Sequence, residues 1–197
     1  MKNLVLFDFD GTISKKDSMI EFLKYYSGKT KFYLTFLGHI HWIIGMHLGI
    51  IEKWRVKQKI WVHLFRNTNE VDFNQKAEFF SLHILPHILY KDALERIKSH
   101  KAGGDRVIII TASAANWISP WCKSFNVELI STCLEVKNGI VTGKIEGKNC
   151  NGIEKVHRIK QLLSLSDFKY IYAYGNSKGD KEMLDIASHP FYKFFQQ

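Results

Sequence analysis

The stretch Leu4-Val5-Leu6-Phe7-Asp8-Phe9-Asp10-Gly11-Thr12 decides how the rest of this 197-residue chain is interpreted. Four apolar residues lead directly into two acids that are separated by one residue, and Gly and Thr follow as a turn signal. A short apolar run bounded by a turn predicts a buried β-strand. If the strand continues through Asp10, both carboxylates lie on one face at its carboxyl end, where open α/β sheets bind ligands. Two neighbouring buried carboxylates need a cation or a proton between them, which favours a functional site over a plain acidic turn.

Length and composition limit the class of protein. The length fits one domain, or one core with a single insertion. The chain starts Met1-Lys2-Asn3 and passes straight into the strand, so we expect no signal peptide. Its three cysteines are too few and too irregularly spaced for a disulfide framework or a zinc site (Cys122, Cys133 and Cys150). This usage is typical of a reducing compartment, and we expect a cytoplasmic protein.

The positive charge is concentrated in one segment. The net charge is +9, and the segment from Lys15 to Arg66 holds ten Lys/Arg and three Asp/Glu, giving 10 − 3 = +7. A basic surface suits nucleic acid, anionic lipid or a phosphorylated substrate, or is simply a solvated surface. No nucleic-acid-binding motif accompanies the charge, so we expect no nucleic-acid partner.

The second half of the chain alternates between strand and helix patterns. Asn138-Gly139, between two alternating segments, is a strong hairpin signal. The alternation predicts an α/β fold with a Rossmann-like parallel sheet. The expected strands are 106–113, 129–130, 133–137, 140–145 and 170–175, and the expected helices are 114–125, 152–163 and 181–187.

Residues 15–88 have a different, helical pattern. Asp17 or Ser18 is a candidate N-cap for a helix that ends at Ser27-Gly28. Further helices are expected at 52–66 and 70–100, with a kink or boundary at Pro86. We therefore expect an all-α helical cap of residues 15–88, inserted into a core domain of residues 1–14 and 89–197.

Residues 32–51 contain no Lys, Arg, Asp or Glu, which leaves three interpretations. The first is a buried helical hairpin within the cap. The second is an interfacial element that dips into a bilayer, supported by nearby Trp residues and flanking Lys and Arg. The third is a membrane span, because twenty residues are about the length that a span requires. Three histidines and three glycines argue against a span, which would also separate the first strand from the rest of the fold.

The Asp8-Phe9-Asp10-Gly11-Thr12 stretch after an apolar strand resembles motif one of the haloacid dehalogenase-like (HAD) phosphohydrolases. The resemblance implies that Asp8 is the nucleophile that becomes an aspartyl-phosphate. It also implies that Asp10 is the general acid/base. Both roles are chemically reasonable, because a carboxylate can accept a phosphoryl group and a second carboxyl can protonate the leaving oxygen.

Two further segments match motifs two and three of that family. Thr111 ends an apolar strand, and the resemblance implies that its hydroxyl and the amide of Ala112 hold the phosphoryl group. Lys155, early in a helix after a glycine, takes the position of the motif-three lysine that stabilises developing charge. Arg158 and Lys160 compete for that role.

The segment Tyr174-Gly175-Asn176-Ser177-Lys178-Gly179-Asp180 resembles motif four, with Asn176 where the family carries a first Asp. The resemblance implies a Mg²⁺ cofactor held by Asp8, Asp10 through its main-chain carbonyl, and Asn176, with Asp180 supporting the site indirectly. An amide oxygen can bind Mg²⁺ but contributes no negative charge, so we expect weaker metal binding.

The cap resembles that of HAD subfamily IB, which contains phosphoserine phosphatase and the phosphatidylglycerophosphatase C type. Asp17 falls near the position of a substrate-binding Glu in phosphoserine phosphatases, and Arg55 is a candidate contact to the substrate, although a solvated Arg explains it as well.

Together these features predict an Mg²⁺-dependent phosphomonoester hydrolase. An apolar and basic cap suits a phosphorylated lipid such as phosphatidylglycerophosphate, with peripheral membrane contact through the cap as an associated hypothesis. The alternatives are phosphoserine or another small metabolite as substrate, phosphoryl transfer to an acceptor other than water, and a catalytically weak domain that binds a phosphorylated ligand because of Asn176.

Overall fold

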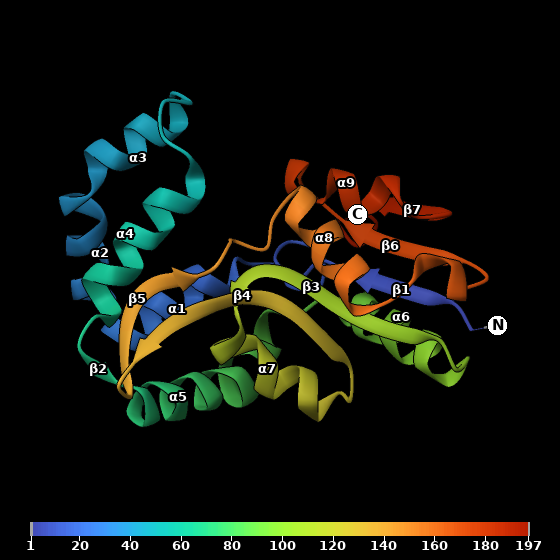
Figure 1. Cartoon of the computed structure of the whole chain (residues 1–197). Helices are drawn as coiled ribbons and strands as arrows, with labels where there is room; N and C mark the ends of the chain where they lie inside the picture. Colours follow the sequence, from blue (N-terminus) through green and yellow to red (C-terminus); the bar gives the residue numbers. More distant parts are fainter. Residues whose placement is uncertain (1, 197) are drawn as a thin grey trace.

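The computed structural model describes residues 2–196. Within them a seven-stranded sheet has the strand order β2-β5-β4-β3-β1-β6-β7 (Figure 1). Five strands are parallel: β1 (Leu4–Phe7), β3 (Arg106–Ala114), β4 (Glu128–Lys137), β6 (Ile171–Gly175) and β7 (His189–Tyr192). The strands β5 (Ile140–Glu146) and β2 (Thr68–Asn69) extend the sheet in antiparallel fashion. The predicted α/β class with a mostly parallel sheet is confirmed.

Helices cover both faces of this sheet (Figure 1). One face packs against α5 (Glu70–Phe79), α6 (Lys91–Ala102) and α7 (Ala115–Ser124), and the other packs against α8 (Ile153–Leu162) and α9 (Lys181–Asp185). At one end of the sheet stand α1 (Ser18–Ser27), α2 (Lys29–Gly38), α3 (Ile40–His47) and α4 (Lys53–Phe65). Short helical turns complete the fold: η1 (Phe80–Ile84), η2 (Leu85–Ile88), η3 (Leu165–Asp167) and η4 (Lys178–Asp180).

Several predicted boundaries differ from the structure. The expected single helix 70–100 is divided into α5, η1, η2 and α6. Pro86 lies in η2, and the chain is extended at Leu89 and Tyr90, just before α6. The expected strands 129–130 and 133–137 are one strand, β4, with a register shift between Leu134 and Val136. The predicted Asn138-Gly139 turn is confirmed, with φ of 51° and 72°. The edge strands β2 and β7 were not expected.

The two ends of the insertion lie side by side. The amide of Lys15 donates to the carbonyl of Ile88 over 2.7 Å, and the amide of Tyr90 donates to the carbonyl of Ile13 over 2.8 Å. The chain thus leaves and re-enters the core at one place, and we propose the division into a core of 1–14 and 89–197 and a cap of 15–88. The cap is helical except for β2, which pairs with β5 and ties it to the sheet.

The cap and the core share one hydrophobic cluster. Phe22 of α1 stacks on Trp117 of α7 with ring centroids 4.6 Å apart, and Trp61 of α4 meets the same indole edge-on at 5.5 Å. All three side chains are fully buried. Aromatic pairs of this kind add ~0.5–1.5 kcal/mol each beyond their buried area. The cluster therefore fixes α1 and α4 against the sheet, at the edge where the strands end.

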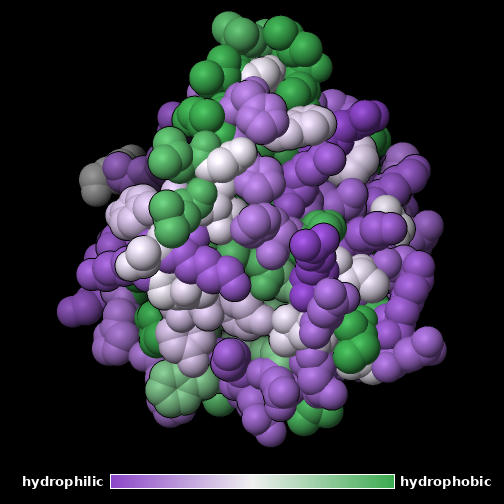
Figure 2. Space-filling view, turned by 90° about the vertical axis from the view of Figure 1, so that its left-hand side faces the viewer, coloured by the Kyte–Doolittle hydropathy of each residue, from purple (hydrophilic) through white to green (hydrophobic). Residues whose placement is uncertain are grey.

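The uncharged segment 32–51 forms α2, α3 and the loop that follows. The two helices are separated at His39, and none of the described helices is long and apolar enough to cross a membrane. The expectation of a fully buried hairpin is wrong, because large apolar side chains such as Leu37 and Leu48 remain about two-thirds exposed, at 67% and 69%. Figure 2 shows hydrophobic surface gathered at the end of the molecule where α3 lies in Figure 1.

Candidate active site

A small polar cavity lies at the carboxyl ends of β1, β3 and β6. β1 ends at Phe7, so the strand does not continue through Asp10 and both acids lie in the segment that follows it. Asp8 and Asp10 nevertheless line the same cavity, whose volume is about 160 Å³. The other lining residues come from the cap, from β3 and from the loops before α8 and α9: Asp17, Met19, Lys57, Thr111, Ala112, Ser113, Asn151, Ser177 and Asp180.

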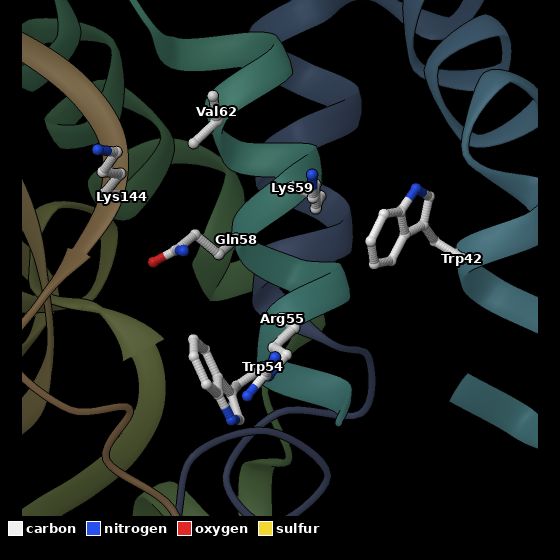
Figure 3. A pocket seen from close by; sticks show the side chains of 7 residues that line it. All are labelled: Trp42, Trp54, Arg55, Gln58, Lys59, Val62 and Lys144. Atoms are coloured by element: carbon white, nitrogen blue, oxygen red, sulfur yellow. The ribbon is translucent and has the colours of Figure 1, made fainter. Parts of the chain in front are cut away.

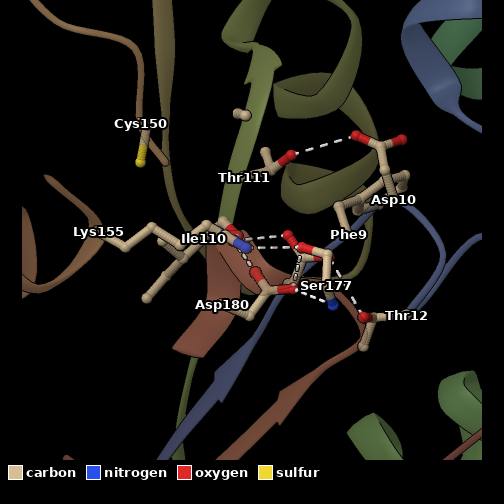
Figure 4. Close-up of polar contacts among 12 residues, drawn as sticks. Phe9, Asp10, Thr12, Ile110, Thr111, Cys150, Lys155, Ser177 and Asp180 are labelled. Atoms are coloured by element: carbon tan, nitrogen blue, oxygen red, sulfur yellow. Dashed lines mark hydrogen bonds and ion pairs between the residues drawn. The ribbon is translucent and has the colours of Figure 1, made fainter. Parts of the chain in front are cut away.

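Lys155 joins two of the predicted carboxylates. Its Nζ lies 2.6 Å from Asp8 Oδ1 and 2.6 Å from Asp180 Oδ1, and it also donates to the carbonyl of Ile110 over 3.1 Å (Figure 4). Its competitors lie elsewhere. Arg158 pairs with Glu154, and Lys160 is exposed. The structure therefore brings together Asp8, Lys155 and Asp180, from segments far apart in the sequence.

This buried charge cluster is incompletely balanced. Burial works to lower the pKa of the Lys155 ammonium, but the charges of Asp8 and Asp180 outweigh it and raise that pKa, so Lys155 stays protonated. Burial raises the pKa of Asp8 to about 7, against the opposing effect of Lys155. Asp180 and Asp10 raise it further by repulsion. A cation at this edge would favour the ionised form of Asp8 that a nucleophile requires.

The Asp10 carboxylate is fixed by the cap and by β3. Its Oδ1 accepts from the amide of Ser18 over 2.6 Å, at the N-terminus of α1. Its Oδ2 accepts from Ser113 Oγ over 2.7 Å and from Thr111 Oγ1 over 3.4 Å. Ser113 was not predicted, although its position two residues after Thr111 places it on the same side of β3. Because Asp17 caps the same helix, α1 holds two acids at the mouth of the cavity.

The loop after β6 is organised by Asp180. Its Oδ2 accepts from the amides of Asn176 and Ser177, over 3.1 and 2.9 Å, and from Ser177 Oγ over 2.8 Å. Its Oδ1 is paired with Lys155. Both oxygens are thus occupied within the protein, which agrees with an indirect supporting role and not with direct metal contact.

The oxygen atoms beside Asp8 suit a magnesium ion. Thr12 Oγ1 lies 3.2 Å from Asp8 Oδ2 and 3.4 Å from Asn176 Oδ1, so a carboxylate and an amide oxygen converge on one hydroxyl. Among the described residues no group of three or more His, Cys, Asp or Glu side chains is placed to hold a metal. Mg²⁺ needs only one or two carboxylates, with other oxygens and water. The donors present fit Mg²⁺ through Asp8, Asn176 and main-chain oxygen.

Of the cap residues considered, the structure brings Asp17 but not Arg55 to the cavity. Arg55 is exposed, pairs with Glu52 over 2.8 Å, and lines a separate hollow of about 400 Å³ between α3, α4 and β5 (Figure 3). Lys57 occupies the site instead. Its Nζ donates to the carbonyl of Ala112 over 2.9 Å and also contacts Asn149 Oδ1.

The helical phase of α4 explains this difference. The helix buries Val56, Ile60 and Leu64, and Lys57 borders that face, whereas Arg55 lies on the outer side. This spacing was available in the sequence and would have favoured Lys57. Burial lowers the pKa of Lys57 to about 8. Enclosure of the Asp17 carboxylate and the charge of Asp10 raise the pKa of Asp17 to about 6, although the outer part of that residue is exposed.

An apolar chamber of about 450 Å³ adjoins the polar cavity. The two share Asp17, Met19, Lys57, Ala112 and Asn151. The remaining walls are mostly apolar and come from α1 to α4, together with Asn149 from the loop before α8: Ile20, Phe36, Ile43, Met46, His47, Lys53, Trp54, Val56 and Ile60. The site therefore has a polar end beside Asp8 and an apolar end within the cap.

Comparison with known proteins agrees with this geometry. The model of the haloacid dehalogenase-like hydrolase family matches residues 5–185. Among curated proteins, CicA of Caulobacter vibrioides is 30% identical over 98% of this chain and 86% of its own length. A histidinol-phosphatase of Neisseria meningitidis is 25% identical over 96% of this chain and 89% of its own length.

Solved structures share the fold. A Bordetella pertussis protein of unknown function superimposes with a TM-score of 0.83 at 24% identity, over 95% of this chain and 88% of that one. A substrate-bound phosphoserine phosphatase superimposes with a TM-score of 0.67 at 17% identity, over 95% and 83%. The chain therefore belongs to the haloacid dehalogenase-like hydrolases, and it is an enzyme of their phosphatase type.

Proposed function

We propose that this protein hydrolyses phosphomonoesters with Mg²⁺ through an aspartyl-phosphate formed on Asp8. The observation that carries the proposal is the position of Lys155 Nζ, 2.6 Å from both Asp8 and Asp180 at the edge of the cavity. A buried cation beside the nucleophile offsets the negative charge that an approaching phosphate adds. Mg²⁺, when bound, supplies further neutralisation of the phosphoryl oxygens.

The reaction proceeds in two successive displacements at phosphorus. An oxygen of Asp8 attacks phosphorus, the bond to the ester oxygen breaks, and Asp10 gives its proton to the leaving alcohol. Asp10 then takes a proton from water, whose oxygen attacks phosphorus and releases Asp8 and inorganic phosphate. Thr111, the amide of Ala112 and Lys155 hold the phosphoryl oxygens. Ser113 and the amide of Ser18 keep the Asp10 carboxylate in place.

Turnover of p-nitrophenyl phosphate with Mg²⁺ tests this scheme. Asp8→Asn should remove turnover. Asp167→Asn changes an exposed acid that does not line the cavity, and it should leave turnover unchanged. Turnover that persists in Asp8→Asn rules out the scheme.

The apolar chamber supports a substrate with a large apolar body, such as a phosphorylated glycerolipid like phosphatidylglycerophosphate. The phosphate would lie beside Asp8 and the apolar part between α1 and α4. Each methylene that enters the chamber contributes ~0.8 kcal/mol, which is about fourfold in affinity. Along a series of n-alkyl phosphates we therefore expect KM to fall with chain length until the chamber is filled. A KM that does not depend on chain length contradicts the lipid assignment.

A small amine-bearing phosphomonoester is the second candidate, and Asp17 favours it. Its carboxylate lies at the junction of cavity and chamber, where it could pair with an ammonium group. Phosphoserine and histidinol phosphate both carry such a group, and the Neisseria relative is named for the latter. The test compares turnover of both compounds by the wild type and by Asp17→Asn. This candidate is supported if Asp17→Asn loses turnover of the two amines but keeps turnover of p-nitrophenyl phosphate.

A further inference from the structure

Helix α3 is apolar on two opposite faces. Ile43 and Met46 face inward and line the apolar chamber, while Ile40, Ile44 and Leu48 recur at helical spacing and are 48%, 53% and 69% exposed. A helix that is apolar all round is ordinarily buried in a core or in a membrane. This helix is covered on one face only.

The exposed face continues onto the neighbouring segments. Leu34 and Leu37 of α2 are 63% and 67% exposed, and Ile50 in the loop after α3 is 77% exposed. The loop has a defined conformation, because the amides of Ile50 and Ile51 both donate to the carbonyl of Gly45, over 2.9 and 3.1 Å. We define the apolar tip by its six residues: Leu34, Leu37, Ile40, Ile44, Leu48 and Ile50. Figure 2 shows hydrophobic surface gathered at the top of the molecule, the end that α3 forms in Figure 1.

Cations and indoles lie close to the apolar tip in the sequence, and we call them the cationic fringe. Exposed Lys29 and Lys31 precede it, and exposed Lys53, Arg55 and Lys59 follow it, with Glu52 as the single acid between residues 29 and 66. At the base of the tip, Lys59 Nζ lies 4.6 Å from the Trp42 ring and the Arg55 guanidinium lies 5.3 Å from the Trp54 ring (Figure 3). Aromatic rings and cations beside an apolar surface are typical of the membrane–water interface.

We propose that the apolar tip docks this protein onto an anionic lipid surface. The charge favours lipid over a second copy of the chain, because self-association through the tip would bring two identical cationic fringes together. Each lysine near an anionic surface adds about fivefold to binding. The mode is peripheral: α2 has ten residues and is about 15 Å long, half of what the hydrocarbon core requires.

Docking of this kind places the chamber beside the lipid. The inward face of α2 and α3 forms one of its walls, and the outward face is the apolar tip. This consequence rests on the proposed lipid-phosphate function, whereas docking itself does not. Vesicle docking and turnover of a lipid phosphate are therefore measured separately.

The test is sedimentation of the full chain with vesicles of phosphatidylcholine alone or with added phosphatidylglycerol, two phosphodiesters that a phosphomonoester hydrolase does not consume. We expect binding to the anionic vesicles that weakens with salt. The double variant Leu48→Ser/Ile50→Ser should reduce it by at least about tenfold. Ile153→Ser/Leu162→Ser, a pair on α8 that is 53% and 49% exposed, should not change it.

Three results overturn the proposal. The first is equal vesicle binding by the tip variant and the α8 variant. The second is no vesicle binding by the parent protein. The third is a dimer in sedimentation velocity that the tip variant dissociates and the α8 variant does not, which would assign the surface to self-association. With Asp8 unchanged, the variant Leu48→Ser/Ile50→Ser should keep the wild-type rate with p-nitrophenyl phosphate, since neither residue lines the cavity or the chamber. That control separates failure of docking from failure of catalysis.

Discussion

Lys57 Nζ donates a hydrogen bond of 2.9 Å to the main-chain carbonyl of Ala112, so that one cap side chain reaches the end of the core strand β3. The cap helix α4 thereby places a cation at the junction of the polar cavity and the apolar chamber. Because α4 is held by the Trp61–Trp117 contact, the cation is positioned before any substrate arrives.

The first prediction concerns the pH dependence conferred by Lys57. Burial lowers its pKa to about 8, so Lys57 is cationic below that pH and neutral above it. KM for an anionic ester should therefore rise as the pH increases through 8. In Lys57→Arg the charge persists, and the rise should move to higher pH. KM–pH profiles of the two proteins check this, and identical alkaline limbs would show that Lys57 does not contact the substrate.

The second prediction concerns the buried cation at the nucleophile. Lys155→Met leaves Asp8 and Asp180 buried without their partner, which should cost about 3–5 kcal/mol in the free energy of unfolding. Turnover should also be lost. Lys160→Met, at an exposed position of the same helix α8, should change neither. Urea unfolding measures the first effect, and wild-type stability in Lys155→Met would contradict the charge cluster described here.

The third prediction concerns the amide in motif four. Asn176→Asp adds a negative charge beside Asp8, where the Asn176 oxygen already converges on Thr12. The Mg²⁺ concentration for half-maximal turnover should fall about tenfold, equivalent to ~1.4 kcal/mol of metal binding. Turnover measured at increasing Mg²⁺ concentration in the wild type and in Asn176→Asp checks this. If the substitution instead creates activity that the wild type lacks, the protein is the weak ligand-binding domain considered from the sequence.

The fourth prediction concerns the glycine that follows the two acids. Gly11 has φ of +80°, and a Cβ there would lie 2.1 Å from Asn176 Nδ2. Gly28 has a similar φ of +76° but open space around it. Both Gly→Ala changes should strain the backbone by ~1–2 kcal/mol, yet only Gly11→Ala should also displace Asn176 and weaken Mg²⁺ activation. Equal Mg²⁺ activation in the two variants would argue against a role for Asn176.

Local patterns predicted most of the core. The apolar runs before Asp8 and Thr111 are strands because residues buried on both faces of a parallel sheet must be apolar, and Asn138-Gly139 is a turn because both residues adopt positive φ. Among three cations, Lys155 is favoured because its spacing from Gly152 and Ile159 resembles the phosphoserine phosphatase-like branch, and α8 begins at Ile153.

Tertiary contacts determined what the sequence did not reveal. β2 is two residues long and β7 is an edge strand that contains Pro190, so neither carries a strand pattern of its own. The strand does not continue through Asp10, and the amide of Ser18, from the cap, helps to define the position of its carboxylate. Lys57 and Arg55 are an exception, because the helical spacing of the apolar residues of α4 would have placed Lys57 nearer the buried side. The apolar chamber is formed by four helices together, so no single segment indicates it.

The proposed mechanism requires that Asp8 becomes phosphorylated during turnover. Rapid acid quenching of the enzyme during hydrolysis of p-nitrophenyl phosphate with Mg²⁺, followed by mass spectrometry of its peptides, measures this. We expect a phosphoryl group on the peptide that contains Asp8, absent when Asp8→Asn is treated in the same way. Turnover with the phosphoryl group on another residue would contradict it.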